Sequence, residues 1–418
     1  MYTEPYDAIV IGGGPAGMMA AITMAGRGLR VLIAERNKLL GRKLRITGKG
    51  RCNITNDCDM DTLISNICQG GKFMYSSLRR FSNYDLIDFF NNNGLPTVTE
   101  RGGRVFPQSQ KAYDVAELLA GFIRNLKIPV LYECKVEKFC FTQNTPSEVS
   151  GIIANVCGKR REIPCKAALI ATGGITYPLT GSTGDGYLLA KQAGHTIVTP
   201  RPSLVALNCR EKSICAALEG LSLKNISVRL ERAGKTVYEG FGEMVFTDAG
   251  VSGPLILSCS RHFESNSNFS IIIDLKPGLT EQQLDARILS DFTKYEKKDF
   301  INALDDLLPK RLISCIVERS KIPARQKVSS ITREQRKKLV DVVKHFTLTP
   351  TETASVEQAI VTAGGIQLSE VNPKTMGSKL CPNLFFAGEV LDVDCYTGGY
   401  NLTVAFSTGY SAGCYIMS

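Results

Sequence analysis

The sequence Gly12-Gly13-Gly14-Pro15-Ala16-Gly17 constrains the fold of this chain more than any other feature. It follows directly on a short apolar run, Tyr6 to Ile11, which predicts a buried strand. A helix over Met18 to Ala25 and a second apolar run, Arg30 to Ala34, complete a βαβ unit. A G-x-G-x-x-G motif alone is weak evidence, but this one has the preceding strand and the following helix that dinucleotide binding requires.

Each residue type in the motif has a physical role at a dinucleotide site. Gly12 permits the tight turn, Gly14 lets the backbone approach a pyrophosphate, and the third glycine lets the helix pack on the strand. The helix start at Pro15 and Ala16 offers unpaired N–H groups and the positive end of its dipole to phosphate. Glu35 ends the second strand, where a carboxylate binds both ribose hydroxyls and disfavours a 2′-phosphate.

Three distant segments favour FAD over NAD as the dinucleotide. Ala167 to Gly174 is an apolar strand ending in Ala-Thr-Gly-Gly, and Leu384 to Glu389 is another ending in Gly-Glu. In flavoproteins with two dinucleotide-binding motifs, such strands return to the adenosine half and to the ribityl and pyrophosphate groups. Thr397 to Leu402 precedes a C-terminal helix whose dipole favours negative charge on the reduced flavin.

The patterns of apolar and polar residues along the chain predict an α/β fold that is interrupted by inserted domains. The 418 residues, 44% hydrophobic and 22% charged, indicate a globular protein of two or three domains. Alternating apolar and polar residues after Gly194 indicate strands, and the segments after Thr280 have helical spacing. We therefore expect a Rossmann-like FAD-binding domain (1–193 and 363–418), an inserted β-barrel-like domain (194–276 and 347–362) and a small helical domain (277–346).

Charge and cysteine content narrow the classes of partner. No apolar run approaches the roughly 20 residues of a membrane helix, and the N-terminus lacks a signal-peptide pattern. The fourteen cysteines form no C-x-x-C pair, which argues against a metal site and predicts reduced thiols in the cytoplasm. The net charge is +10, but the densest basic groups, Arg42 to Arg45 and Arg333 to Lys338, lack interleaved aromatics. We therefore expect neither a nucleic-acid nor a membrane partner.

Five motifs in order resemble one bacterial flavoprotein family, whose members are called aminoacetone oxidase, BaiN-like bile-acid pathway flavoprotein or NAD(P)/FAD-dependent oxidoreductase. The motifs are GGGPAG, GRKLRITGKGRCNITN, ATGGITYPLTGSTGDGY, GGIQLSEVNPKTMGSKL and FFAGEVLDVDCYTGGYNLTVAFSTGYSAG. The resemblance covers the whole chain. It implies an FAD domain with inserted β-barrel-like and helical domains, in agreement with the plan above.

The resemblance also implies site residues. Where the family reads S-G-G-G-R-C-N, this chain has Thr47 to Asn53, with Lys49 in place of a glycine. Near the C-terminus, Cys395 replaces a family glycine, and Thr403-Val404 replace Gln-Trp. From the motif and the resemblance, the expected cofactor-binding residues are Gly12, Gly14, Pro15, Ala16, Gly17, Glu35, Arg36, Lys43, Thr47, Gly48, Gly50, Arg51, Cys52, Asn53, Val136, Ala171, Thr172, Gly173, Gly388, Glu389, Gly399, Tyr400, Asn401 and Leu402.

The chemistry at the flavin has few candidate residues. No second G-x-G-x-x-G motif appears, so NAD(P)H is expected only as a transient electron donor. None of the three histidines lies in a cofactor motif, which disfavours a histidine acid or base. Tyr177 and Tyr400 are candidate proton donors, and Cys52 is a candidate thiol near the ring. Structural packing is the competing interpretation for each of them.

We therefore expect an FAD-dependent oxidoreductase with a small-molecule substrate. The favoured reaction is NAD(P)H-driven hydride transfer through flavin N5 to an activated C=C bond, such as the enone of a steroid-like acid. The alternatives are an amine oxidase that uses O₂, as the aminoacetone oxidase name implies, an RNA-modifying flavoprotein, and a flavin-based redox sensor.

Overall fold

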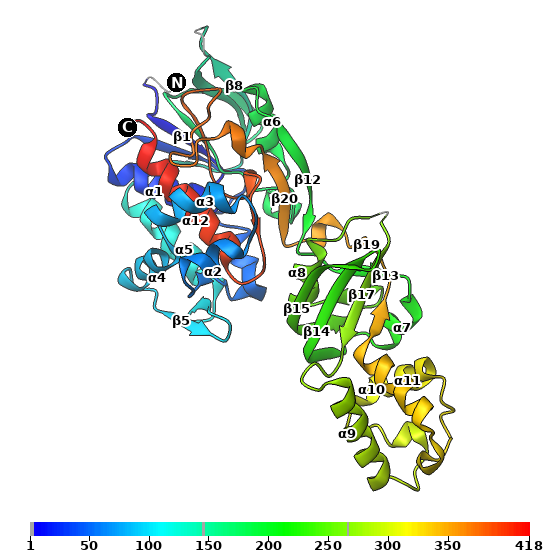
Figure 1. The fold of residues 1–418 in the computed structure, drawn as a ribbon. Helices are drawn as coiled ribbons and strands as arrows, with labels where there is room; N and C mark the ends of the chain where they lie inside the picture. Colours follow the sequence, from blue (N-terminus) through cyan, green and yellow to red (C-terminus); the bar gives the residue numbers. More distant parts are fainter. Residues whose placement is uncertain (1–3, 144–146, 266) are drawn as a thin grey trace. The chain divides into compact units, whose positions relative to one another are not determined.

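The computed structural model describes residues 4–143, 147–265 and 267–418 and divides the chain into two compact units (Figure 1). The first unit contains the segments up to Ser203 and from Val356 to Ser418. The second unit is Leu204–Ser355. The second unit is therefore an insertion into the first, as the change in the pattern of apolar residues along the sequence predicted.

A parallel five-stranded sheet forms the centre of the first unit, in the order β21-β11-β1-β2-β7. The three strands β11, β1 and β2 are buried along their whole length, as parallel strands covered on both faces are. The predicted βαβ unit is confirmed. The strands are β1 Ala8–Ile11, β2 Val31–Ala34, β7 Val130–Leu131, β11 Ala168–Ile170 and β21 Leu384–Phe386.

Two helices far apart in the sequence pack along each other in this unit, α1 and α12 (Figure 1). A Cβ added at Gly409 of α12 would lie 2.2 Å from the carbonyl oxygen of Ala16, so only glycine allows this approach. The helices of the unit are α1 Pro15–Gly26, α2 Met60–Ser65, α3 Gly71–Arg80, α4 Asn83–Asn92, α5 Ala112–Asn125, α6 Asp185–Gln192 and α12 Tyr400–Tyr415.

The polar stretch of residues 39–56 is mostly turns and a distorted 3-10 helix, Leu44–Gly50. It ends in the short strand β3, Thr55–Asn56, which pairs with β6. The remaining strands of the first unit are β4 Ile67–Gln69, β5 Thr97–Glu100, β6 Arg104–Pro107, β8 Cys134–Phe141, β9 Val149–Val156, β10 Lys159–Pro164, β12 Ile197–Ser203, β20 Val361–Ile366 and β22 Asp394–Cys395.

The first unit extends past residue 193, where we had expected the inserted β domain to begin. Strand β12 (Ile197–Ser203) pairs antiparallel with β20 (Val361–Ile366), and this pairing holds residues 197–203 in the first unit. The division in the structure therefore falls between Ser203 and Leu204.

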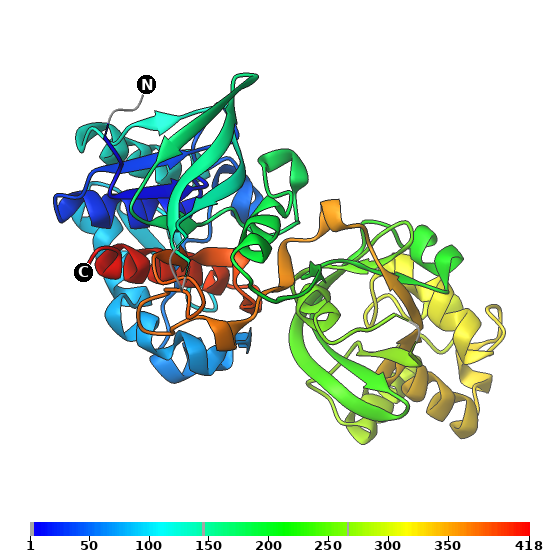
Figure 2. The same ribbon diagram turned by 90° about the horizontal axis from the view of Figure 1, so that it is seen from above.

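A large sheet, mostly green in Figure 2, dominates the second unit. It is antiparallel and has seven strands in the order β18-β17-β14-β15-β16-β13-β19. Its strands are β13 Leu207–Cys209, β14 Ser222–Arg232, β15 Lys235–Phe246, β16 Gly250–Ser252, β17 Phe269–Asp274, β18 Phe346–Leu348 and β19 Pro350–Thr353. The expected insertion is therefore rich in strands, although it also contains the short helices α7 Lys212–Ala217 and α8 Pro254–Ser260.

Three helices follow β17 in the second unit: α9 Glu281–Lys294, α10 Lys310–Ser320 and α11 Arg333–Lys344. Pro309 precedes α10 and separates it from a short 3-10 turn. Thr332 and Gln335 form a capping box at the start of α11. These helices share one buried apolar cluster with the seven-stranded sheet. The boundaries that we expected between the β domain and the helical domain stay a prediction.

Candidate cofactor site

The glycine-rich turn between β1 and α1 lies against the segment that follows β11. A Cβ added at Gly12, whose φ is +105°, would lie 2.5 Å from the carbonyl oxygen of Ala171. A Cβ at Gly17 would lie 2.0 Å from the carbonyl oxygen of Gly12. Gly14, in contrast, has no neighbouring atom within 4 Å of its Cβ position, and no side chain caps α1, which begins at Pro15. Gly12 and Gly17 are therefore tightly packed against other backbone atoms, whereas Gly14, at the start of α1, has free space beside it.

The carboxylate of Glu35 is held at the tip of β2. Its Oε2 accepts the N–H of Gly13 at 2.7 Å, and its Oε1 accepts the N–H of Asn37 at 2.7 Å. The backbone N–H of Cys134, at the start of β8, donates to the carbonyl of Glu35 at 2.9 Å. Val136, two residues further along β8, is buried. The structure therefore brings Glu35 and Val136 to the same end of the sheet as the glycine turn.

A hydrogen-bonded cluster joins the loop after β2 to the turn after β21. Lys43 Nζ lies 2.7 Å from Glu389 Oε2 and 2.8 Å from Thr176 Oγ1. The other carboxylate oxygen, Glu389 Oε1, accepts the N–H of Thr362 at 2.8 Å. The preceding Gly388 has φ +77°, and a Cβ there would lie 2.9 Å from the Cβ of Ala16. Four segments are thus fixed around Glu389.

The segment after β11 is tied to the loop after β2. Arg36 pairs with Asp185 at 2.9 Å and also donates to Thr183 Oγ1. Asn37 Nδ2 donates to the carbonyl of Thr180 at 2.9 Å. Thr172 packs against α6, because a Cβ at Gly186 would lie 2.1 Å from Thr172 Oγ1. Gly173 follows it with φ +75°.

The loop from Thr47 to Asn53 adopts a strained backbone. Gly48, Lys49 and Cys52 all have left-handed φ values, +57°, +58° and +59°. Thr47 anchors the loop, because its Oγ1 donates to the carbonyl of Leu44 at 2.7 Å. Lys49 stands where the family has glycine, and the φ value explains why glycine suits that position. Non-glycine residues in this region often cluster at functional sites.

Arg51 is anchored away from the glycine turn. Its guanidinium bonds Glu100 and Gln110 and lies 4.0 Å from the centre of the Phe106 ring. The neighbouring Gly50 has φ +84°. Arg51 therefore fixes the loop onto the β5–β6 hairpin, and a direct contact of its side chain with the cofactor stays a prediction.

The N-terminus of α12 rests on β3. Gly399 has φ +102°, and a Cβ there would lie 2.3 Å from the carbonyl oxygen of Thr55. The hydroxyls of Thr55 and Thr403 lie 2.6 Å apart and are fully buried. Thr403, a departure from the family pattern, therefore has a packing role. No side chain caps α12, so its first N–H groups are available to a ligand.

Asn401 uses its side chain to clamp the preceding loop. Its Oδ1 accepts the N–H of Cys395, and its Nδ2 donates to the carbonyl of Cys395, each at 3.0 Å. Leu402 is half-buried and packs against the main apolar cluster. These contacts position the Thr397–Gly399 turn, and cofactor contact by the two side chains stays a prediction.

The three candidate catalytic side chains differ in their surroundings. Burial raises the pKa of Tyr400 to about 12, with a further contribution from the thiols of Cys58 and Cys395. Burial also raises the pKa of Cys52 to about 12, so that its thiol is protonated at neutral pH. Tyr177 has φ +54° and lies 5.9 Å from Lys43 Nζ, measured to the ring centre. Their catalytic roles stay predictions.

The residues present fit FAD. The side-chain oxygen Oδ1 of Asn53 is buried and has no hydrogen-bond partner among the described residues. Such an orphaned acceptor is costly unless a ligand donor satisfies it, and a flavin ring carries an N–H group of this kind. Two uncapped helix N-termini, those of α1 and α12, lie in the same unit. They suit the two anionic parts of FAD, the pyrophosphate and the reduced ring.

Two of the three histidines, His195 and His345, have partners outside the predicted site residues. His195 is buried between Glu370, 3.1 Å from its Nδ1, and Ser378, 2.7 Å from its Nε2. Burial lowers the pKa of His195. His345 bonds Asp341 at 2.9 Å on the surface of α11. None of these contacts involves a predicted site residue.

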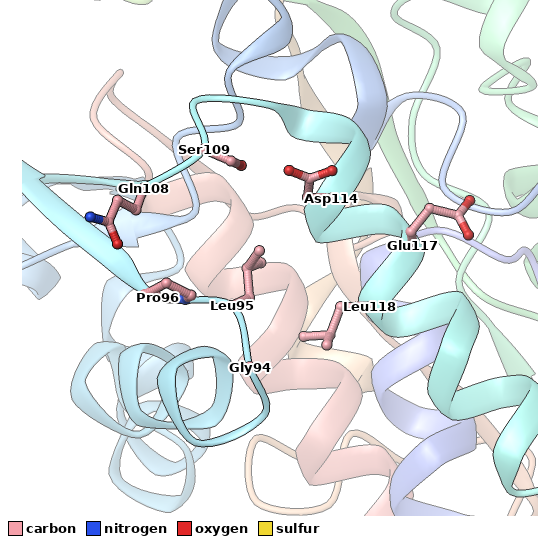
Figure 3. Close-up of a pocket in the computed structure, with 8 residues that line it drawn as sticks. All are labelled: Gly94, Leu95, Pro96, Gln108, Ser109, Asp114, Glu117 and Leu118. Carbon is pink, nitrogen blue, oxygen red and sulfur yellow. The ribbon is translucent and has the colours of Figure 1, made fainter.

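A cavity of about 650 Å³ lies between α5 and the loop after α4 (Figure 3). None of the predicted cofactor residues lines it. Glu117, on its rim, pairs with Arg45 of the 3-10 helix at 2.7 Å, so the cavity adjoins an anchor of the Thr47–Asn53 loop. Its lining residues are Gly94, Leu95, Pro96, Gln108, Ser109, Asp114, Glu117 and Leu118.

Sequence reasoning missed three residues that shape the site: Thr176, Thr362 and Gly409. Thr176 lies inside the quoted ATGGITYP motif and was a detectable candidate. Gly409 likewise lies inside the last quoted motif, but its role depends on the backbone of α1. Thr362 carries no local signal, because its role depends on Glu389.

Comparison with known proteins adds the following. The profile of the family described as "HI0933-like protein Rossmann domain" matches residues 6–415. A 3-dehydro-bile acid delta(4,6)-reductase of Clostridium scindens is 31% identical over 97% of this chain and 97% of its own length. A ribosomal RNA dihydrouridine synthase of Haemophilus influenzae is also 31% identical, over 97% of each chain.

Solved structures resemble this fold at low sequence identity. The 3-ketosteroid delta1-dehydrogenase of Sterolibacterium denitrificans aligns with a TM-score of 0.54 and 12% identity, over 99% of each chain. At that identity the likeness concerns the fold alone. Among the described residues, no helix combines the length and the apolar character needed to span a bilayer.

Proposed function

The chain belongs to the HI0933-like family, and we propose that this FAD-dependent oxidoreductase reduces a carbon–carbon double bond conjugated with a carbonyl group. The observation that carries the proposal is the chemistry common to two relatives of equal similarity. By their names, one reduces 4,6-double bonds of a 3-oxo bile acid, and the other converts uridine to dihydrouridine. Each name describes addition of two hydrogens to a C=C bond polarised by a carbonyl.

The proposed reaction balances with a nicotinamide donor. NAD(P)H gives up a hydride and becomes NAD(P)⁺, the substrate carbon β to the carbonyl receives the hydride, and the α-carbon receives a proton. Bound FAD supplies the two-electron relay between donor and substrate. The expectation of a transient NAD(P)H donor is kept here because the relative from Clostridium scindens is a reductase by name.

The protein residues supply the proton and the positioning in this proposal. Tyr400, at the N-terminus of α12, has a protonated phenol at neutral pH, as an ordinary tyrosine does, and burial raises its pKa further, to about 12. A neutral phenol can donate to a carbonyl oxygen or to the α-carbon. Tyr177 is the second candidate. Its backbone position next to Thr176 places it beside the Lys43–Glu389 pair.

The substrate we favour is a small enone of the steroid or bile-acid type. An anaerobic two-step experiment tests it with the purified holoprotein. NADH or NADPH is added first, and loss of the flavin absorbance is followed. A 3-oxo-Δ4 bile acid is then added, with its saturated counterpart as the control. Recovery of the absorbance with the enone alone is expected.

Two results would contradict the proposal. Failure of both nicotinamides to bleach the flavin would exclude them as electron donors. Bleaching of the flavin by small amines, followed by its reoxidation under air with release of hydrogen peroxide, would favour the amine-oxidase alternative. Tyr400→Phe and Tyr177→Phe separate the proton donors. The variant that removes the donor should slow reoxidation by the enone and leave the bleaching rate unchanged.

A second substrate for the same chemistry is uracil in RNA. The relative from Haemophilus influenzae favours it, because it is as similar to this chain as the bile-acid enzyme. A uridine-containing RNA replaces the enone in the second step of the experiment, with RNA in which dihydrouridine replaces uridine as the control.

A further inference from the structure

Two segments of the second unit hold much of the chain's positive charge. Residues 294–299 and 321–338 contain ten lysines and arginines but only three acidic residues, in a chain whose net charge is +10. In the sequence these segments are separate, and the second contains Arg333 to Lys338, one of the two densest basic groups of the chain. We define the helical basic surface as Lys297, Lys298, Arg325, Arg333 and Lys337.

The fold brings the two segments side by side. The N–H of Val328 donates to the carbonyl of Lys298 at 3.2 Å, and Lys327 Nζ donates to the carbonyl of Lys297 at 3.3 Å. Gln326 and Gln335 exchange two side-chain hydrogen bonds, at 3.1 and 3.0 Å, which join the loop to the first turn of α11. The two basic segments are therefore neighbours in the fold.

The acidic neighbours are largely engaged with other cations. Asp299 pairs with Lys327 at 2.8 Å, and Glu334 pairs with Lys338 at 3.5 Å. Glu296 is the remaining carboxylate of the two segments. The five cations of the helical basic surface are exposed, and within the described part of the chain none of them forms an ion pair. Their charge is available to a partner.

The other dense basic group of the sequence behaves differently. Lys43 pairs with Glu389, and Arg45 pairs with Glu117, each at 2.7 Å. Arg42 donates to the side chain of Asn37 at 3.0 Å. The charges of that group are therefore used in contacts within the candidate cofactor site. The contrast indicates that the helical basic surface is not explained by internal packing.

The side chains of the helical basic surface favour a nucleic acid over a lipid membrane as its partner. In the described structure, no large hydrophobic side chain of the two segments is among the exposed ones, so insertion into a lipid interface has no apolar anchor. Tyr295 lies within the surface, with Lys298 Nζ 3.9 Å from its ring centre. Lysine and arginine beside an aromatic ring suit a regularly spaced phosphate backbone.

We propose that the helical basic surface binds the phosphate backbone of RNA. The inference rests on the second substrate proposed above, uracil in RNA, and assigns the contact that would hold such a substrate. It replaces our expectation from the sequence that no nucleic acid is bound.

The test compares two triple variants of the holoprotein. Arg325→Ala, Arg333→Ala and Lys337→Ala remove three charges from the surface. The matched control removes three exposed lysines from the strand-rich part of the same unit, Lys212→Ala, Lys224→Ala and Lys235→Ala. The probe is a fluorescein-labelled RNA hairpin of about 30 nucleotides with a uridine loop. Its anisotropy is measured from 50 to 300 mM KCl, and thermal unfolding confirms that both variants are folded.

We expect the surface variant to bind the hairpin about tenfold or more weakly than the control. The slope of log K against log salt should fall by about 2 to 3, because each lost phosphate contact removes roughly 0.7 to 0.9 from it. Equal affinities of the two variants, or no binding by the wild type at 50 mM KCl, would overturn the inference. Binding to vesicles with 20% phosphatidylserine in place of RNA would overturn it as well.

The outcome is separable from that of the proposed reaction. Bleaching of the flavin by NAD(P)H and its reoxidation by the bile-acid enone do not require the helical basic surface. If the surface variant binds RNA normally but the flavin still cycles with the enone, the inference fails alone. If RNA binds through the surface but no conjugated carbonyl reoxidises the flavin, the reaction proposal fails alone.

Discussion

Lys43 Nζ and Glu389 Oε2 lie 2.7 Å apart although 346 positions separate the two residues in the sequence. Each side chain is 20% exposed, so the pair is only partly screened by solvent. It joins the loop after β2 to the turn after β21, and both segments carry predicted cofactor residues. This ion pair therefore holds together two segments of the candidate cofactor site.

Lys43→Met should therefore weaken both the fold and flavin binding. The substitution leaves the Glu389 carboxylate partly buried with only the donors of Thr176 and Thr362. We expect a loss of about 1 to 3 kcal/mol in the free energy of unfolding. The FAD dissociation constant, followed by flavin fluorescence, should rise about tenfold.

The control for that variant is Lys38→Met. Lys38 pairs with Glu133 at 3.5 Å, but its side chain is 81% exposed. An exposed pair contributes little, so the change should stay within about 0.5 kcal/mol. Equal effects of the two variants would refute the central role of the Lys43–Glu389 pair.

Asn53→Ala should separate flavin affinity from stability. The buried Oδ1 of Asn53 has no partner in the described structure, so its removal should cost the apoprotein little and leave its melting temperature nearly unchanged. FAD should bind about 5- to 10-fold more weakly, because one hydrogen bond of about 1 kcal/mol is lost. Titration of the apoprotein with FAD provides the measurement.

Asn83→Ala provides the opposite pattern. Asn83 Nδ2 donates to the carbonyls of Asn56 and Cys58 at 2.7 and 2.8 Å, and these bonds hold the segment after the cofactor loop. This variant should destabilise the apoprotein by about 1 to 3 kcal/mol. If Asn53→Ala destabilises the apoprotein equally, its oxygen has a protein partner in solution.

Gly409→Ala should disrupt the contact between α12 and α1. The added Cβ would lie 2.2 Å from the carbonyl oxygen of Ala16, so the helices must separate. We expect a destabilisation of about 2 kcal/mol or more, measured by urea unfolding. Gly121→Ala in α5 is the matched control, because the nearest atom to its Cβ is the end of Arg124 at 3.8 Å.

Helix propensity should make that control stabilising by about 0.5 to 1 kcal/mol. If both alanines stabilise the protein, the two helices do not pack as closely in solution as the structure has them.

Local patterns in the sequence were sufficient for the elements whose formation depends on neighbouring residues. The glycine turn at Gly12, the break at Pro309 and the capping box at Thr332 are each set within a few residues. The same reasoning had a signal for α4 that was not used, since Ser82 and Asp85 form a capping box. Element type was therefore predictable where caps and periodicity agree.

Partners chosen across the fold were not predictable from one sequence. Nothing near Lys43 indicates that Glu389 is its partner, and nothing near Lys298 indicates that Val328 lies beside it. The assignment of residues 197–203 also depended on a distant strand, β20. The sequence shows which buried donors and cations need a partner. Only the fold of the chain shows which residue is that partner.

Because Cys52 is buried, the stability of the protein should decrease as the pH becomes alkaline. Its thiol is fully buried, and burial raises its pKa to about 12. In the unfolded chain the pKa of a cysteine is about 8.5. Below that value both states keep the proton, and the neutral thiol contributes its full stability. As the pH rises toward 12, the unfolded state alone loses the proton, so the native state is progressively disfavoured.

Cys52→Ala should flatten this dependence. Between pH 9 and 10.5, the free energy of unfolding of the variant should fall less steeply than that of the wild type, by up to about 1.4 kcal/mol per pH unit. Urea unfolding at fixed pH values measures the slope. Cys157→Ala, at an exposed cysteine, should leave the slope of the wild type unchanged. Parallel curves for Cys52→Ala and the wild type would mean that the Cys52 thiol ionises in the folded protein, which would restore it as a candidate nucleophile beside the flavin.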